Sequence, residues 1–63
     1  MISIYIQTES AAFDDGNKGF EVARILREMA DTAENGDFTS FVMDINGNFA
    51  GEMIETDEEG YLQ

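Results

Sequence analysis

One amphipathic segment, residues 19–35 (GFEVARILREMADTAEN), limits the fold of this chain more than any other feature. Its apolar side chains recur at the i, i+3, i+4 and i+7 spacing that gathers them on one stripe of an α-helix: Val22, Ile25, Leu26, Met29, Ala30 and Ala33. Most of the charged residues fall on the other side: Glu21, Arg24, Arg27, Glu28, Asp31 and Glu34. The sequence therefore predicts one helix, whose apolar stripe must be covered by the rest of the 63 residues.

A strand is predicted ahead of this helix, in residues 1–7 (MISIYIQ). Ile2, Ile4 and Ile6 alternate with more polar residues, which is the pattern of a half-buried β-strand. We expect the helix to bury these three isoleucines. The loop that follows contains Phe13 between two alanines and two aspartates, and Phe13 is predicted to anchor the loop to the core.

Residues 38–45 (FTSFVMDI) and 48–55 (NFAGEMIE) are two apolar runs separated by turn residues, the pattern of a β-hairpin. The order strand, helix, strand, strand predicts a single α+β domain of β-α-β-β type over residues 1–56. Its three-stranded, mainly antiparallel sheet would have one helix packed on one face.

The helix acts as a crossover, so the first and second strands run the same way and the third runs against both. The third strand would then lie in the middle of the sheet; the order with the second strand in the middle is the alternative. Either order leaves one sheet face bare, with Tyr5 and part of the hairpin on it. Bare faces and unprotected edges often pair with another chain, so a homodimer through the exposed sheet face or edge is one expectation.

Residues 44–51 (DINGNFAG) allow two interpretations. Together with Glu55, the oxygen-bearing residues of this stretch match positions of an EF-hand calcium loop, but Phe49 stands where that loop needs glycine. As a turn, Asp44 and Gly47 are the first and fourth residues of type I, with Gly47 in the left-handed position of a three-residue hairpin loop. The turn accounts for more of the residues, and we predict no metal site and no cofactor.

The hairpin loop also decides which side chains share a face. A three-residue loop places Met43 opposite Phe49 and Phe41 opposite Gly51, and gathers four large side chains: Phe41, Met43, Phe49 and Met53. A two-residue Asn46-Gly47 turn shifts the pairing by one residue and gathers a different set: Phe41, Met43, Ile45, Ala50 and Ile54. The first register is preferred because it leaves one face polar, with Ser40, Asp44, Asn48 and Glu52.

The chain contains 14 Asp and Glu residues against three Lys and Arg, and its net charge is −11. This charge opposes direct binding to nucleic acid or to an anionic membrane. The absence of His removes the commonest general base and leaves the serines without an activating partner, so an enzyme is not expected. With no Cys, no apolar run of about 20 residues and no signal-like N-terminus, we expect a soluble cytoplasmic domain.

Acidic residues occur in clusters, and these clusters supply the candidate partner-binding residues. One set lies along and after the helix, Glu28, Asp31, Glu34 and Asp37, and another lies in the first loop, where Asp14 and Asp15 follow Glu9. The acidic tail, residues 57–63, is expected to be flexible. DNA carries one charge per roughly 1.7 Å of its axis. A chain of this size could imitate that density only if its acidic clusters converged on one face.

The runs AAFDD, EVARILREMAD and DINGNFAG resemble those of a group of short uncharacterised phage and prophage proteins. These proteins share an opening strand, an acidic loop after AAF, an EVARILR-like helix and a D-x-NGN-x-x-G hairpin. The resemblance spans most of residues 2–55 and implies the fold and a phage origin. Small acidic phage proteins often bind a host protein, including defence nucleases and CRISPR complexes.

The sequence and this resemblance together lead to a hypothesis of function. The chain would be a small acidic protein-binding module, a phage-encoded anti-CRISPR or other anti-defence inhibitor. It would act in the host cell, as a nucleic-acid mimic, on a basic host protein that binds nucleic acid. The alternative is a small structural or accessory phage protein without inhibitory activity, whose charge serves solubility only.

Overall fold

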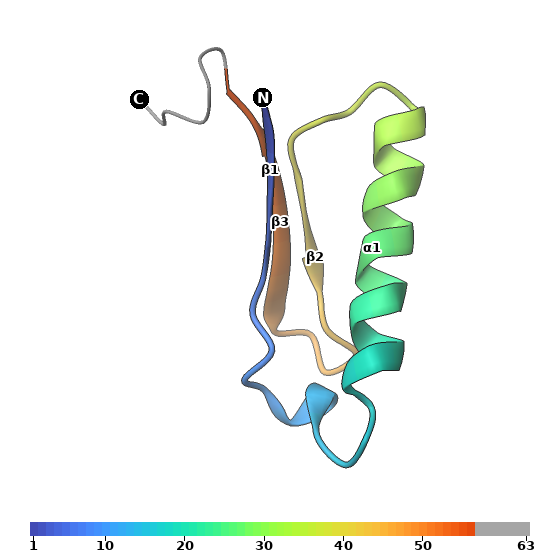
Figure 1. Cartoon of the computed structure of the whole chain (residues 1–63), viewed down its shortest axis with the longest axis vertical. Helices are drawn as coiled ribbons and strands as arrows, with labels where there is room; N and C mark the ends of the chain where they lie inside the picture. Colours follow the sequence, from blue (N-terminus) through green and yellow to red (C-terminus); the bar gives the residue numbers. More distant parts are fainter. Residues whose placement is uncertain (57–63) are drawn as a thin grey trace.

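The computed structural model describes residues 1–56, and the acidic tail predicted to be flexible, residues 57–63, lies outside the described residues (Figure 1). The elements follow in the order β1 (Ile2–Ile6), a short 3-10 helix η1 (Ala11–Phe13), α1 (Lys18–Glu34), β2 (Ser40–Met43) and β3 (Phe49–Glu55). The predicted β-α-β-β architecture is confirmed. In Figure 1, α1 runs alongside the sheet, and η1 lies at the end where α1 begins.

The sheet has the order β1-β3-β2, and both pairs are antiparallel. The preferred strand order, with the third strand in the middle, is therefore confirmed. β3 is the longest strand, and its residues Ala50, Gly51 and Met53 are buried. A central strand suits this segment, because Gly51, Glu52 and Met53 pair with both neighbouring strands while its small residues lie beneath the helix.

The hairpin register combines the two predicted registers. Next to the turn the three-residue loop is present: the Asp44 N–H donates to the Asn48 carbonyl oxygen at 2.7 Å, and Met43 lies opposite Phe49. The register then shifts between Val42 and Met43, so that Val42 pairs with Gly51. Ala50 is the extra residue of this β-bulge.

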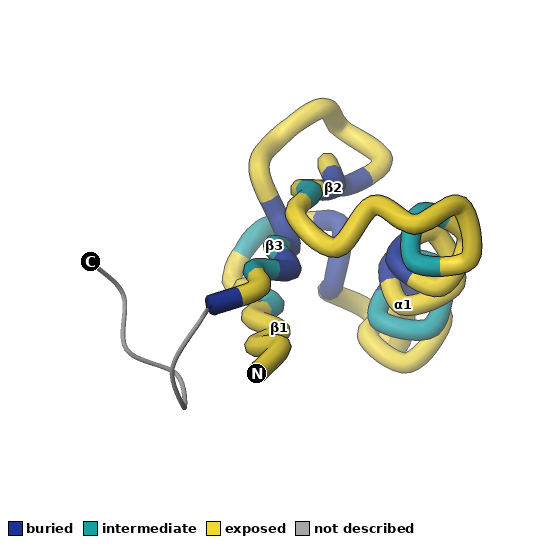
Figure 2. Tube along the Cα trace, turned by 90° about the horizontal axis from the view of Figure 1, so that it is seen from above, coloured by how far each residue is buried: buried dark blue, intermediate teal, exposed yellow. Residues whose placement is uncertain are grey.

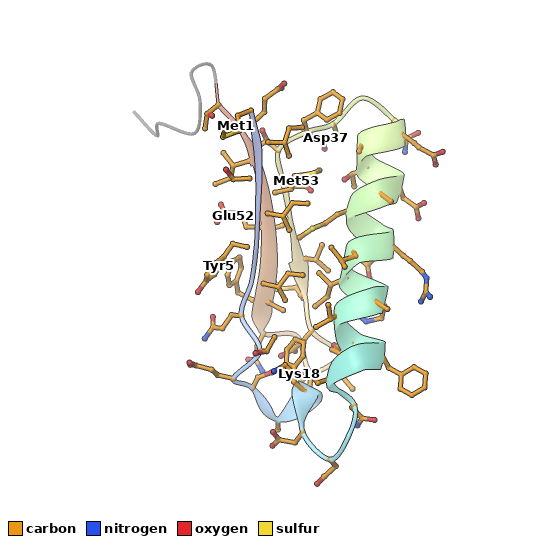
Figure 3. The ribbon with its side chains drawn as sticks, viewed as in Figure 1. Met1, Tyr5, Lys18, Asp37, Glu52 and Met53 are labelled. Atoms are coloured by element: carbon orange, nitrogen blue, oxygen red, sulfur yellow. The ribbon has the colours of Figure 1, made fainter. Side chains whose placement is uncertain are left out.

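Beyond the bulge, the preferred register was wrong by one residue. Phe41 lies opposite Glu52 instead of Gly51, and Ser40 lies opposite Met53. Opposed residues share a face, so Met53 lies on the helix side of the sheet and not in the predicted cluster. It is 3% exposed there. Figure 3 shows Met53 on the helix side of the sheet, whereas Glu52 and Tyr5 point to the other side.

The core lies between α1 and the strands β2 and β3. Figure 2 shows the buried segments gathered on the facing sides of the sheet and the helix. Phe13 is buried in this core, as predicted for a loop anchor, and the largest fully buried side chains of residues 1–56 are those of Ile25 and Met29. The core residues are Ala12, Phe13, Ile25, Met29, Val42, Ala50 and Met53.

The predicted apolar stripe of the helix is only partly buried. Ile25 and Met29 face the core, while Leu26 and Ala30 are exposed and Glu21 is buried in their place. α1 packs mainly against β2, and Glu21 and Arg24 bind the hairpin on that side, at the Ile45 N–H and the Met43 carbonyl oxygen. As a result, a face centred on Glu21, Ile25 and Met29 packs against the sheet.

The expectation that the helix would bury all three isoleucines of β1 was wrong. Only Ile6 packs partly against the core; Ile2 is 43% exposed and Ile4 is 51% exposed. Both side chains lie on the helix side of the sheet, because they pair with Glu55 and Met53 of β3. They remain open because α1 packs on β2 and β3 and does not reach across to β1.

Replacing Gly47 by alanine is expected to lower the free energy of unfolding by about 1–2 kcal/mol. Gly47 has φ +85° in the hairpin turn, a backbone conformation in which a Cβ clashes with the following carbonyl oxygen. The matched control is Gly19→Ala on α1, where a Cβ would meet no atom within 4 Å. This control should be neutral or stabilising, by up to about 1 kcal/mol. Urea unfolding followed by circular dichroism measures both, and equal values for the two variants would contradict the prediction.

Candidate protein-binding surface

The helix carries one of the two predicted acidic clusters. Glu28, Asp31 and Glu34 lie on α1, and Asp37 lies in the connection to β2; all four are exposed. Residues three apart on a helix are neighbours, so the three helical acids form one line along the outside of α1. We call these four residues the helix acidic patch.

The other predicted residues, Asp14 and Asp15, lie at the opposite end of the molecule. They are exposed in the turn between η1 and α1. α1 has 17 residues, which corresponds to about 25 Å of helix. Figure 3 shows Lys18 and Asp37, which bracket this helix, at the two ends of the domain. The six predicted residues therefore occupy two separate surfaces.

Two members of the helix acidic patch already bind other groups of the same chain. Glu28 forms an ion pair with Arg24, and the Asp37 carboxylate accepts a hydrogen bond from the Thr39 N–H at 3.2 Å. Within residues 1–56, Asp31 and Glu34 form neither an ion pair nor a side-chain hydrogen bond. These two carboxylates are consequently the members of the patch that are most available to an external cation.

A buried carboxylate that the sequence did not predict lies at the start of the helix. Glu21 is 5% exposed and binds Arg24 through both oxygens, with Nε to Oε1 at 3.1 Å and Nη2 to Oε2 at 2.8 Å. The Ile45 N–H also donates to Glu21 Oε2 at 3.0 Å. The pKa of Glu21 is lowered, chiefly by the hydrogen bonds from Arg24, and the pKa of Arg24 is raised in return.

Arg24 extends this link from the helix to the hairpin. Its Nη2 donates to the Met43 carbonyl oxygen at 2.9 Å as well as to Glu21. The pair therefore holds the first turns of α1 against the end of β2 and the hairpin turn. The available signal was the spacing of Glu21 four residues before Ile25 and eight before Met29, which places all three on one helix face.

Asp44 is the second buried carboxylate, at 5% exposure. Its Oδ1 accepts the N–H groups of Asn46 and Asn48 at 2.8 and 2.9 Å, and its Oδ2 accepts the Ser10 hydroxyl at 2.7 Å. These bonds lower the pKa of Asp44, with the Ser10 hydroxyl as the main cause. The first residue of DINGNFAG thus caps its own turn and ties that turn to the loop after β1.

The buried carboxylates serve the fold. Each accepts three hydrogen bonds within residues 1–56 and has a lowered pKa, which makes it a poor general acid near neutral pH. Within residues 1–56, no group of three or more His, Cys, Asp or Glu residues is placed to hold a metal ion.

The sheet face opposite α1 is a second exposed surface. It carries aromatic and long apolar side chains, and the one charged side chain among its strand residues is Glu52, which lies between Tyr5 and Phe41 in the pairing register. The exposed apolar residues of this face are Tyr5, Phe41, Met43 and Phe49. This face was predicted to be bare, and the positions of Tyr5 and the hairpin residues confirm that prediction.

Comparisons of this chain with protein-family models, with curated proteins and with solved structures found no match. Among residues 1–56, no helix combines the length and the apolar character needed to cross a membrane.

Proposed function

We propose that this protein is a small acidic protein-binding module whose helix acidic patch contacts lysine and arginine side chains of a basic partner. The observation that carries the proposal is the state of Asp31 and Glu34. They lie three residues apart on the outside of α1, exposed, and without an ion pair or side-chain hydrogen bond among the described residues. Such carboxylates can accept charge-assisted hydrogen bonds from a partner without breaking any bond of their own.

The charge balance supports the same proposal. The three cationic side chains of the chain are Lys18, Arg24 and Arg27, and Arg24 is occupied by Glu21 and Glu28. The surface potential is therefore set by the acids. A potential of one sign speeds the encounter with an oppositely charged partner and selects against partners of like charge.

The biological role that we propose is inhibition of a host protein that binds nucleic acid, by a phage-encoded chain. The resemblance of the helix and hairpin motifs to phage proteins and the net charge of −11 support this role. The partner's phosphate-binding lysines and arginines would meet Asp31, Glu34 and Asp37. The contact would be one of binding, not of catalysis.

Neutralising the outer helix acids is expected to abolish this binding. The test is capture of host-cell proteins on the immobilised chain at about 50 mM and about 500 mM salt, since exposed charge pairs are screened as ionic strength rises. The triple variant Asp31→Asn, Glu34→Gln, Asp37→Asn should lose any basic protein that the native chain captures at low salt. The matched control removes three acids elsewhere: Glu9→Gln, Asp14→Asn, Asp15→Asn. It should retain that protein.

The captured protein is then purified, and its binding to labelled DNA or RNA is measured with and without the chain. The proposal requires that the native chain compete with nucleic acid. The variant with three substitutions in the helix acidic patch should compete at least tenfold less. If no basic protein is captured at low salt, or if both triple variants lose it equally, the helix acidic patch is not the binding surface.

The second candidate is a structural or accessory protein whose charge only maintains solubility. The separation of the helix acidic patch from Asp14 and Asp15 by the length of α1 favours this alternative, because it spreads the charge more thinly than in a nucleic acid. Under this alternative, the variant with three substitutions in the helix acidic patch behaves as the native chain does in every binding measurement.

A further inference from the structure

The outer edge of β1 offers backbone groups to a further strand. β1 pairs on one side with β3, and within residues 1–56 no strand pairs with its other side. The Gln7 N–H donates to the Ala50 carbonyl oxygen at 2.7 Å, and the Met1 carbonyl oxygen accepts the Thr56 N–H at 2.9 Å. Since hydrogen-bonding direction alternates along an antiparallel strand, the odd-numbered residues of β1 bond to β3. The N–H and C=O groups of Ile2, Ile4 and Ile6 therefore point outward.

The same edge lacks the features with which proteins usually protect an edge strand. Such features are charged side chains, proline, bulges and very short strands. β1 contains no charged side chain and no proline, and its pairing with β3 is continuous over five residues. The other edge strand, β2, has four residues and adjoins the β-bulge. Of the two edge strands of this sheet, β1 is the longer, and its pairing register has no irregularity.

The side chains beside this edge are apolar and only partly covered. Ile2 and Ile4 are 43% and 51% exposed on the helix side of the sheet. The alternating pattern of this strand predicts burial of its isoleucines, but α1 does not cover Ile2 and Ile4. A strand added to β1 would cover these side chains without any movement of the helix.

We propose that β1 pairs antiparallel with β1 of a second copy of this chain, around a two-fold axis at Ile4. Ile4 is the central residue of the five-residue strand, so Ile4 of each copy would exchange both of its backbone hydrogen bonds with Ile4 of the other. Ile2 of one copy would lie opposite Ile6 of the other. Opposed residues share a face, so the isoleucines of both copies form one apolar strip between the two helices.

A second copy fits this edge better than a partner of a different kind. The strand is self-complementary about its central residue, as an isologous two-fold interface requires. It contains no charged side chain in a chain of net charge −11, so pairing at β1 brings together a segment of each copy that adds no side-chain charge to the contact. A basic extended peptide would find no carboxylate in β1 to bind.

The dimer should be weak and strengthened by salt. A five-residue strand is about 17 Å long, which places the contact among interfaces below about 1,200 Å² that dissociate on dilution. Each copy repels the other through its net charge, and added salt screens that repulsion. This dependence is opposite to that of the proposed partner binding through the helix acidic patch, so the two proposals can fail separately.

Amide hydrogen exchange followed by NMR tests the pairing on the full chain, between about 10 µM and about 1 mM protein, a range that covers weak association. The amides of Ile4 and Ile6 should gain protection as concentration rises, while those of Ser3, Tyr5 and Gln7 should be protected throughout. Sedimentation should show the mass rising from 7.0 kDa toward twice that value. Higher salt should shift both changes to lower protein concentration.

A pair of variants separates this edge from the open sheet face. Ile4→Lys should remain folded by circular dichroism and have the mass of one chain at every concentration, whereas Tyr5→Lys, on the opposite face of the same strand, should still dimerise. The native-chain exchange experiment tests the proposal even if Ile4→Lys fails to fold. A single-chain mass at the highest concentration would overturn the proposal. So would a doubled mass without protection of Ile4 and Ile6, or protection that does not change with concentration.

Discussion

Replacing Ile25 by alanine is expected to lower the free energy of unfolding by about 2–5 kcal/mol. Ile25 has no exposed surface and lies at the centre of the core between α1 and β3. A small domain starts near the lower end of the usual stability range of about 5–15 kcal/mol, because it buries a smaller share of its surface than a large one. Loss of this side chain should therefore remove most of the cooperative thermal transition, as measured by circular dichroism.

The same site makes a second, more specific expectation possible, because Gly51 on β3 lies directly beneath Ile25. A Cβ at Gly51 would lie 2.9 Å from Ile25 Cγ2 and 2.9 Å from Met29 Cε. Gly51→Ala alone should therefore cost about 1–3 kcal/mol through overpacking. The Met29 methyl can move aside at the end of a flexible side chain, so the contact with Ile25 Cγ2 should account for most of the lost stability.

The double variant Ile25→Ala, Gly51→Ala should lose less stability than the sum of the two single variants, because the new methyl group occupies space that Ile25 vacates. Urea unfolding of all four proteins in a double-mutant cycle measures this coupling. The cycle of Ile25→Ala with Gly19→Ala is the control, since Gly19 has no neighbouring atom within 4 Å of a Cβ. Additivity of the Gly51 cycle within about 0.5 kcal/mol would show that Ile25 does not require a glycine beneath it.

The elements of this fold could be predicted because each has its own local periodicity. The helix was predicted at residues 19–35 and is observed at Lys18–Glu34, a difference within the usual variation at helix ends. The register of the hairpin could not be predicted in full. The register shifts at Ala50, next to Gly51, where α1 packs closely on β3. The local pattern of residues 38–55 fits either register and does not predict this shift.

In the candidate surfaces, too, local spacing predicts some features, whereas contacts between distant segments decide the others. Exposure of Asp31 and Glu34 follows from helical spacing, and the structure places both outside. Glu21 was assigned to the solvent side, although its partner Ile45 lies 24 residues away in the hairpin and holds it inside the domain. Exposure of Ile4 was missed for the opposite reason: strand periodicity identifies a face suited to burial, but not whether the helix reaches it.

Acid is expected to destabilise the fold through Glu21 and Asp44, the buried carboxylates of residues 1–56. Glu21 and Asp44 have lowered pKa values in the folded state, caused by the donors that Arg24, Ser10 and the hairpin N–H groups supply. A lowered pKa means that the carboxylate stabilises the fold at pH above its unfolded pKa. That contribution is lost as pH falls through the folded value. Stability should therefore decline as pH decreases below about 4, although fewer negative charges then repel one another.

The variant Asp44→Asn isolates this effect, because it removes the charge while keeping a side chain of similar shape. It should be clearly less stable than the native chain at about pH 7, and the difference should be smaller at about pH 3, which is below the ordinary pKa of an aspartate. The control Asp31→Asn removes an exposed carboxylate without an ion pair or side-chain hydrogen bond among residues 1–56. It should be at least as stable as the native chain at pH 7, since it reduces the net negative charge and with it the repulsion among the acids. Equal destabilisation by Asp44→Asn at both pH values would mean that the shape of the turn, and not the carboxylate charge, holds DINGNFAG in place.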